Sequence, residues 1–242
     1  MNRRSVLKTV GGASLLPTSG GVVSARGTNN TNTGASRERQ RRRECPRPNC
    51  IHPVLGYTGL SADESVPAPI RPDHEVALVT RPPGEDDDRP IPEFFFEPTG
   101  LHVSAGDVVR FNLMTPDHTV TAYHPGLGRQ RRVPEGVPPF SSPVLAGGAF
   151  WLYRFDTPGV YDLLCAPHEI FGMVGRVVVG NAESDFGDAG PQLRPPELTA
   201  ALVFDDPALR PDNIVSETTV GWAELAPESK QLLIELTEGD SE

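Results

Sequence analysis

Residues 160–179, VYDLLCAPHEIFGMVGRVVV, consist of two apolar runs joined by a short loop. The runs Val160–Cys165 and Met173–Val179 are rich in Val and Leu, which predicts two β-strands. Pro167 favours a tight turn between them, and Gly172 lets the chain bend back toward the second strand. We therefore expect two neighbouring strands with a tightly folded connection.

The connecting loop carries three side chains that can bind a metal. Cys165, His168 and Met173 stand at Cys-x2-His-x4-Met spacing, so a thiolate, an imidazole and a thioether lie close together in the sequence. A fourth ligand must come from elsewhere, and His118, at the start of an earlier predicted strand, is the best candidate. Two imidazoles and one thiolate with a distant thioether are typical of a blue-copper electron-transfer centre. The spacing therefore predicts one mononuclear type 1 copper site.

Further strands are predicted on the N-terminal side of this loop. The 242 residues include 24 Gly and 26 Pro, which argues against a helical bundle and for short strands with long loops. From residue 74 to residue 180 the pattern alternates between apolar and polar positions. It predicts an all-β fold, an antiparallel two-sheet sandwich. The predicted strands are Glu75–Thr80, Glu93–Glu97, Leu101–Val103, Asp107–Leu113, Thr119–Tyr123, Phe150–Phe155, Val160–Cys165 and Met173–Val179.

The N-terminal segments indicate export. Residues 1–25 contain Arg3 and Arg4 before a weakly apolar stretch and small residues, which is typical of a twin-arginine export signal. Such a signal implies an extracellular or cell-surface location. Residues 26–73 are expected to be a disordered, low-complexity linker. Thiols oxidise outside the cell, so we expect Cys45 and Cys50 to close a disulfide loop in it.

The alternation stops after the predicted sandwich. Residues 181–242 form an acidic C-terminal extension that we expect to be partly helical. A short helix is predicted over Pro227–Leu236, with Pro227 in its first turn. Trp222 is expected to anchor the extension onto the sandwich. No function follows from this segment.

The charge balance excludes one class of partner. The formal net charge is −10, from 22 Lys and Arg against 32 Asp and Glu. Most of the excess acid lies beyond the N-terminal segments, which argues against nucleic acid as the partner of the folded part. Lysine occurs only at Lys8 and Lys230, and an acidic, lysine-poor surface is typical of extreme halophiles. The chain contains no run of about 18 apolar residues, so the sequence predicts no transmembrane segment. Peripheral attachment at the cell surface stays open.

Two stretches resemble the small blue copper proteins of the cupredoxin family, such as plastocyanin, pseudoazurin and the haloarchaeal halocyanins. Residues 165–177, CAPHEIFGMVGRV, are similar to the ligand loop and final strand of that family. Residues 96–112, FEPTGLHVSAGDVVRFN, are similar to its earlier strand pair. The family often has Asn directly after the first ligand His, whereas this chain has Thr119, whose hydroxyl could take over the task of joining the two ligand segments.

The resemblance implies a Greek-key cupredoxin sandwich over residues 74–180 that serves as an electron carrier and not as an enzyme. Copper would be held by the four residues already identified, with Met173 as the axial ligand. Electrons would pass through the solvent-facing edge of His168. Ile170 and Phe171 would form part of an apolar docking patch for a redox donor and acceptor.

Two other functions remain open from the sequence. Copper delivery or storage usually needs several Met or Cys ligands, and the chain has only three of each. A copper-dependent oxidoreductase needs a second copper site with clustered histidines and an open coordination position. The chain contains no His-x-His pair, and His124 is expected to have a structural role in a loop.

Overall fold

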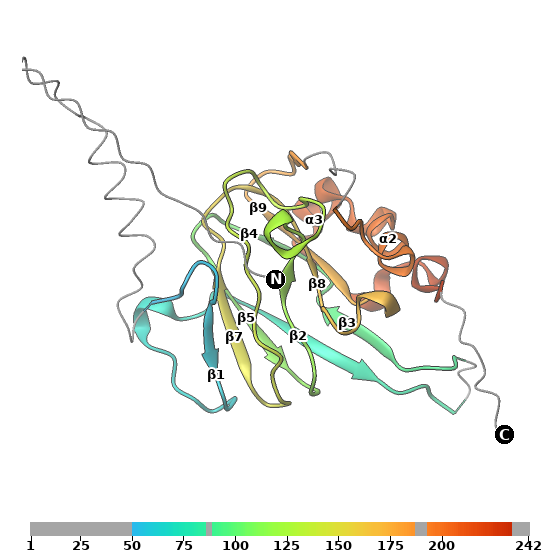
Figure 1. Ribbon diagram of the computed structural model, residues 1–242, viewed down its shortest axis with the longest axis horizontal. Helices are drawn as coiled ribbons and strands as arrows, with labels where there is room; N and C mark the ends of the chain where they lie inside the picture. Colours follow the sequence, from blue (N-terminus) through green and yellow to red (C-terminus); the bar gives the residue numbers. More distant parts are fainter. Residues whose placement is uncertain (1–49, 86–88, 187–192, 234–242) are drawn as a thin grey trace, which may run out of the picture.

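The computed structural model describes residues 50–85, 89–186 and 193–233. In this part of the chain two five-stranded sheets pack face to face (Figure 1). The strand order of the first sheet is β1 (Tyr57–Gly59), β7 (Phe150–Arg154), β5 (Val108–Leu113), β2 (His74–Arg81) and β3 (Glu93–Glu97). The order of the second is β10 (Thr219–Val220), β4 (Gly100–Val103), β9 (Val174–Val179), β8 (Gly159–Leu164) and β6 (Thr121–Ala122).

The two-sheet sandwich predicted from the sequence is confirmed, with one difference in strand direction. Most neighbouring strands are antiparallel, but β2 pairs with β5 and β4 pairs with β9 in parallel. Both sheets are therefore mixed. The expected strand over Thr119–Tyr123 is reduced to β6, because the amides of Thr119 and Val120 bond to Cys165 Sγ and Ser142 Oγ and not to a neighbouring strand.

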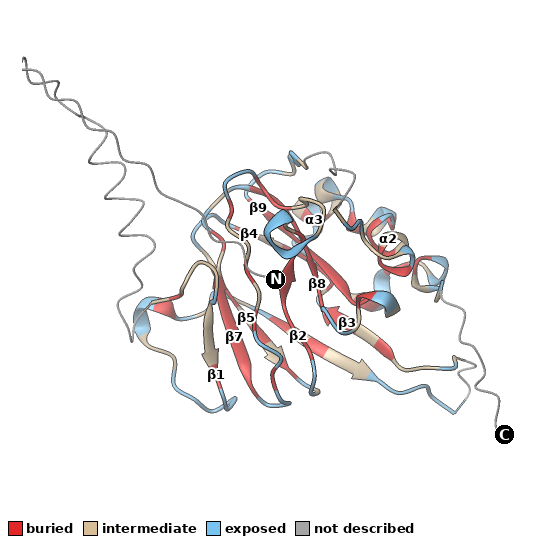
Figure 2. Ribbon diagram, in the orientation of Figure 1, coloured by how far each residue is buried: buried red, intermediate tan, exposed pale blue. Residues whose placement is uncertain are grey.

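The sheets enclose the main hydrophobic core, which we call the inter-sheet core. It includes Phe111, Phe140, Trp151, Tyr161 and Cys165, all of them almost completely buried. Figure 2 shows the buried strands that line it. Aromatic rings fill much of this core, and the rings of Phe140 and Tyr153 stack with their centroids 3.9 Å apart.

Residues 50–73 were expected to form a linker, but they pack against the first sheet. The strand β1 pairs with β7, and Ile51 and Ile70 are buried against Phe150. Gly59 crosses directly over the ring of Phe150, at a place where a Cβ atom would overlap the ring. The predicted export signal, the N-terminal part of the predicted linker and Cys45 lie outside the described residues. Cys50 is disulfide-bonded, and its pairing with Cys45 stays a prediction.

The C-terminal extension covers the outer face of the second sheet. Its helices α2 (Leu198–Phe204) and α3 (Pro211–Glu217) lie against β9 and β4 (Figure 1). Their apolar side chains and those of the sheet form a second cluster, the extension core. Its members are Phe95, Tyr123, Val160, Leu164, Val174, Val178, Ala200, Val203, Phe204, Leu209, Ile214, Val220, Trp222 and Leu225.

Short 3-10 helices connect these elements. They are η1 (Ala68–Ile70), η2 (Pro125–Leu127), η3 (Glu169–Phe171), η4 (Pro207–Leu209), η5 (Trp222–Glu224) and η6 (Pro227–Lys230).

The predictions for the extension were right about Trp222 and wrong about the helix. The indole of Trp222 stacks on Phe95 with centroids 5.4 Å apart. The helix expected over Pro227–Leu236 is only the 3-10 helix η6. The chain becomes extended at Gln231, and the amide of Leu233 bonds to Thr199 Oγ1 of α2 instead of to a helix carbonyl. The last residues of that expected helix lie outside the described residues.

Candidate metal centre

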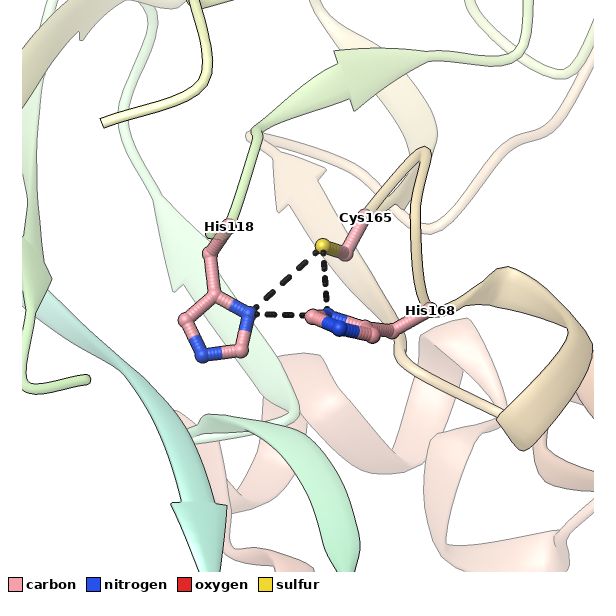
Figure 3. Close-up of side chains that lie close together, drawn as sticks. All are labelled: His118, Cys165 and His168. Atoms are coloured by element: carbon pink, nitrogen blue, oxygen red, sulfur yellow. Dashed lines mark hydrogen bonds between the residues drawn. The ribbon is translucent and has the colours of Figure 1, made fainter. Parts of the chain in front are cut away.

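Three of the four predicted ligands point toward one another (Figure 3). The Sγ atom of Cys165 lies 3.6 Å from Nδ1 of His118 and 3.4 Å from Nδ1 of His168, and the two nitrogens are 3.1 Å apart. The point equidistant from the three atoms, the centre of a triangle with these sides, lies about 2.0 Å from each of them. Bonds from a metal to imidazole or thiolate are about 2.0 to 2.3 Å long. The donor triangle therefore fits a single metal ion.

Backbone hydrogen bonds fold the ligand loop. The amide of His168 donates to the carbonyl of Cys165, and the amide of Met173 donates to the carbonyl of His168. The amide of Cys165 donates in turn to the carbonyl of Met173, which closes the base of the loop. Gly172 has φ of 88°, a left-handed conformation that glycine adopts without strain. Cys165 and His168 therefore project to the same side.

The sulfur of Cys165 is buried. Burial raises the pKa of this thiol to about 11, although hydrogen bonds from Thr119 and His168 act in the opposite direction. A coordinating metal displaces the thiol proton, so a buried cysteine of this kind is a suitable metal ligand. The hydroxyl of Thr119 accepts a hydrogen bond from the amide of Ala166 at 2.8 Å. Thr119 thus joins the two ligand segments, the task expected of its hydroxyl.

Two threonines orient the ring of His118. Its Nε2 atom lies 2.8 Å from the hydroxyl of Thr115 and 3.1 Å from that of Thr80. An Nε2–H that donates to these oxygens leaves the lone pair of Nδ1 directed at the site. Burial, followed by the charge of nearby His168, lowers the pKa of His118 to about 4, although Asp117 opposes the shift. The imidazole is therefore neutral at pH 7, the form that binds metals.

The ring of His168 is half-buried beneath aromatic side chains. It stacks on Phe94, with centroids 4.2 Å apart and an angle of 16° between the ring planes. Phe94 also stacks on Phe171, and Ile170 beside it is 41% exposed. Burial lowers the pKa of His168, against the influence of Asp117. The one partly accessible ligand is therefore surrounded by apolar and aromatic groups.

Met173 lies at the base of the loop and is fully buried in the inter-sheet core with Cys165. Its role as a metal ligand stays a prediction.

The other four histidines lie elsewhere. His124 caps η2 by accepting a hydrogen bond from the Gly126 amide, which confirms its structural role. His52 accepts hydrogen bonds from two loop amides, His74 pairs with Asp107, and His102 bonds to a carbonyl. Among the described residues, the group formed by His118, Cys165 and His168 is the metal-binding cluster that the geometry reveals.

Sequence reasoning missed the residues around the ligands. Thr115 stands three positions before His118, so a local signal for it existed. Thr80 and Phe94 come from a hairpin far away in the sequence, and nothing near the ligand motifs indicates them.

Comparison with known proteins agrees with this geometry. Residues 89–180 match the family described as copper binding proteins, plastocyanin/azurin family. Plastocyanin from Prochlorothrix hollandica is 35% identical over 88 residues, which cover 35% of this chain and 62% of that protein. Pseudoazurin from Paracoccus pantotrophus is 33% identical over 94 residues, 39% of this chain and 59% of that protein. The chain thus spans about three fifths of the length of these relatives.

Among solved structures, pseudoazurin from Methylobacterium extorquens AM1 is 27% identical, with coverage of 60% of this chain and 96% of that one and a TM-score of 0.33. The stretch that matches the copper binding family, residues 89–180, contains all four predicted ligands. The sandwich and the donor triangle thus belong to a chain whose residues 89–180 are similar to the copper binding proteins of the plastocyanin/azurin family. This stretch resembles pseudoazurin and plastocyanin, and the group of His118, Cys165 and His168 that could hold a metal ion lies within it.

Proposed function

We propose that this protein carries single electrons between redox partners through one type 1 copper. His118, Cys165 and His168 would hold the copper, with Met173 as the fourth ligand. The observation that carries the proposal is the donor triangle, whose three atoms come from two distant segments and stand at metal-binding distance from one common point.

The bound copper supplies a one-electron couple, Cu(II)/Cu(I), and the protein supplies a fixed ligand geometry. Thr80 and Thr115 orient His118, while Thr119 holds the ligand loop against the segment that bears His118. Because these side chains are already held by hydrogen bonds, few groups need to move when the charge of the site changes. Little reorganisation permits fast outer-sphere transfer.

Electrons enter and leave through His168, the ligand with partial access to solvent. The exposed side chain of Ile170 and the half-buried ring of Phe171 form the apolar docking patch beside it. The stack of Phe94 on the imidazole limits access of water to the same face. The burial of Cys165 and His118 argues against copper delivery, because a delivery site must hand its ion to a partner.

We further propose that the protein is exported by the twin-arginine route and works outside the cell or at its surface. The paired Arg3 and Arg4 support this proposal, and so does the expected disulfide of Cys50. The lysine-poor, acidic sequence supports a haloarchaeal type that needs high salt. Among the described residues, none of the helices is both long and apolar enough to cross a membrane.

The test is the visible spectrum of the purified protein after addition of one equivalent of Cu(II). We expect an intense thiolate-to-copper absorption band that ascorbate bleaches. Cys165→Ser should abolish the band, whereas His102→Gln, a change at a histidine far from the ligand loop, should leave it intact. Met173→Leu should keep the colour and shift the reduction potential, because the axial bond is weak. A colourless wild-type protein, or a band that survives in Cys165→Ser, would refute the proposal.

A further inference from the structure

The ligand loop contains a buried carboxylate, that of Glu169. This residue directly follows the ligand His168, and it is only 2% exposed. Burial of a carboxylate costs several kcal/mol unless partners compensate for it. A polar residue at this place, beside a copper ligand and away from solvent, therefore needs an explanation.

The partners of Glu169 come from three other parts of the chain. Its Oε1 atom accepts a hydrogen bond from the hydroxyl of Tyr123 at 2.7 Å and a longer one, 3.3 Å, from the amide of Glu197. Its Oε2 atom lies 2.6 Å from Nη1 of Arg129, whose side chain is 12% exposed. Tyr123 follows β6, Arg129 follows η2, and Glu197 immediately precedes α2. The carboxylate is compensated only when all three segments are in place around the loop.

The extension also touches the far end of the loop. A Cβ atom built on Gly172 would lie 3.1 Å from Cγ2 of Thr199 and 3.4 Å from Cγ2 of Val203, both on α2. Phe204, at the end of the same helix, packs edge-on against the ring of Tyr123, with centroids 5.7 Å apart. The segment between the ligands His168 and Met173 is therefore in contact with the extension at both of its ends.

We propose that Glu169 is a positioning residue for the copper centre, through which α2 of the C-terminal extension holds the ligand loop in its metal-binding shape. This inference rests on the proposed function, because it takes His168 and Met173 as ligands. The inference also gives the extension a role. The extension supports the ligand loop from the face of the second sheet that lies opposite to the inter-sheet core.

The decisive variant is Glu169→Gln, which keeps the size of the side chain and removes its charge. Loss of a partner that orients metal ligands lowers metal affinity by about tenfold to a hundredfold. We therefore expect at least about tenfold weaker copper binding in competition with a chromophoric Cu(I) chelator. The absorption band and the copper hyperfine splitting should also change, which a loss of general stability alone would not cause. Glu217→Gln, at an exposed residue of α3, is the matched control and should leave all three unchanged.

A second pair of variants isolates the contact with α2. Glu197 has φ of −59°, which proline also adopts, so Glu197→Pro removes the amide donor with little change of backbone. Glu197→Ala removes the side chain and keeps the amide. We expect the proline variant alone to alter the band and to speed up hydrogen exchange of residues 166–173. If Glu169→Gln fails to fold, Tyr123→Phe removes a single hydrogen bond from the same carboxylate and should act in the same direction.

Hydrogen exchange of the copper-free protein separates this inference from the proposed function. A colourless wild type would overturn the copper proposal. Faster hydrogen exchange of the loop in Glu169→Gln would still show that Glu169 holds the loop in its shape. A blue wild type would support the copper proposal. If Glu169→Gln and Glu197→Pro then matched it in copper affinity, spectrum and loop exchange, the positioning role would be wrong.

Discussion

The two faces of the second sheet lie against cores that handle buried polar groups in different ways. On the side of the inter-sheet core, the side chains of His118, Cys165 and His168 come together to form the metal site. On the side of the extension core, buried charged groups are paired with each other. Asp162 is fully buried there between the guanidinium groups of Arg132 and Arg176.

The alternation of β8 produces this difference. Tyr161, Leu163 and Cys165 belong to the inter-sheet core, whereas Val160 and Leu164 belong to the extension core. Asp162, between them in the sequence, pairs across the strands with Arg176 of β9. Because successive side chains point to opposite faces, β8 and the residue directly after it supply a metal ligand to one core and the carboxylate of an ion pair to the other. The extension is therefore a packed part of the structure that surrounds the metal site.

The largest expected effect is that of Asp162→Asn. Arg176 donates to Asp162 through Nε at 2.7 Å and through Nη2 at 3.0 Å, and it also donates to the carbonyl of Leu209 in the extension. Loss of the carboxylate charge leaves a buried guanidinium without its partner. We expect a fall of about 3 to 5 kcal/mol in the free energy of unfolding, measured by denaturant titration.

The control for this variant is Asp212→Asn, whose ion pair with Arg210 is exposed and should contribute nothing measurable. Equal stability of the two variants would mean that ion pairing does not hold the extension core together.

A smaller effect is expected from Trp222→Phe, which tests how the extension is attached. The indole Nε1–H donates to the carboxylate of Glu93 at 3.0 Å, and a phenylalanine would keep the stack on Phe95 but not this bond. We expect a loss of about 2 kcal/mol, the value of a hydrogen bond to a charged group. Trp222→Leu removes the stack as well and should cost more. If the phenylalanine variant is as stable as the wild type, stacking alone attaches this part of the extension.

The smallest expected effect lies outside both cores, at Asp107 in the turn before β5. Burial raises the pKa of Asp107, but hydrogen bonds from His74 and the Ser104 amide outweigh it, so the pKa falls below its usual 3.8. The ionised carboxylate therefore stabilises the fold above about pH 4, and this stabilisation is lost as the pH falls through the lowered pKa. Asp107→Asn should cost about 1 kcal/mol at pH 7.

The difference between this variant and the wild type should shrink steadily below pH 4 in thermal unfolding experiments. A difference that stays constant down to pH 2 would mean that the charge of Asp107 is not what stabilises the turn.

Much of the sandwich could be predicted from sequence because its strands are marked by local patterns. The predicted boundaries of Glu93–Glu97 agree with β3, and those of the other long strands differ by about one residue. The strands β1 and β10 were missed because they are two or three residues long and exist only through their partners β7 and β4. The helices α2 and α3, of seven residues each, were missed because they are too short to show a clear period.

The sequence by itself determined the ligand loop, since the spacing of Cys165, His168 and Met173 is covalent and the turn at Gly172 is local. It also identified His118 as the fourth candidate, because imidazole is a copper ligand and His118 stands at the start of a predicted strand. Only the tertiary structure decided which side chains support these ligands. Thr80, Phe94 and the partners of Glu169 reach the site from segments far away in the chain, and contacts of that kind depend on how the sheets and the extension pack and not on any local pattern.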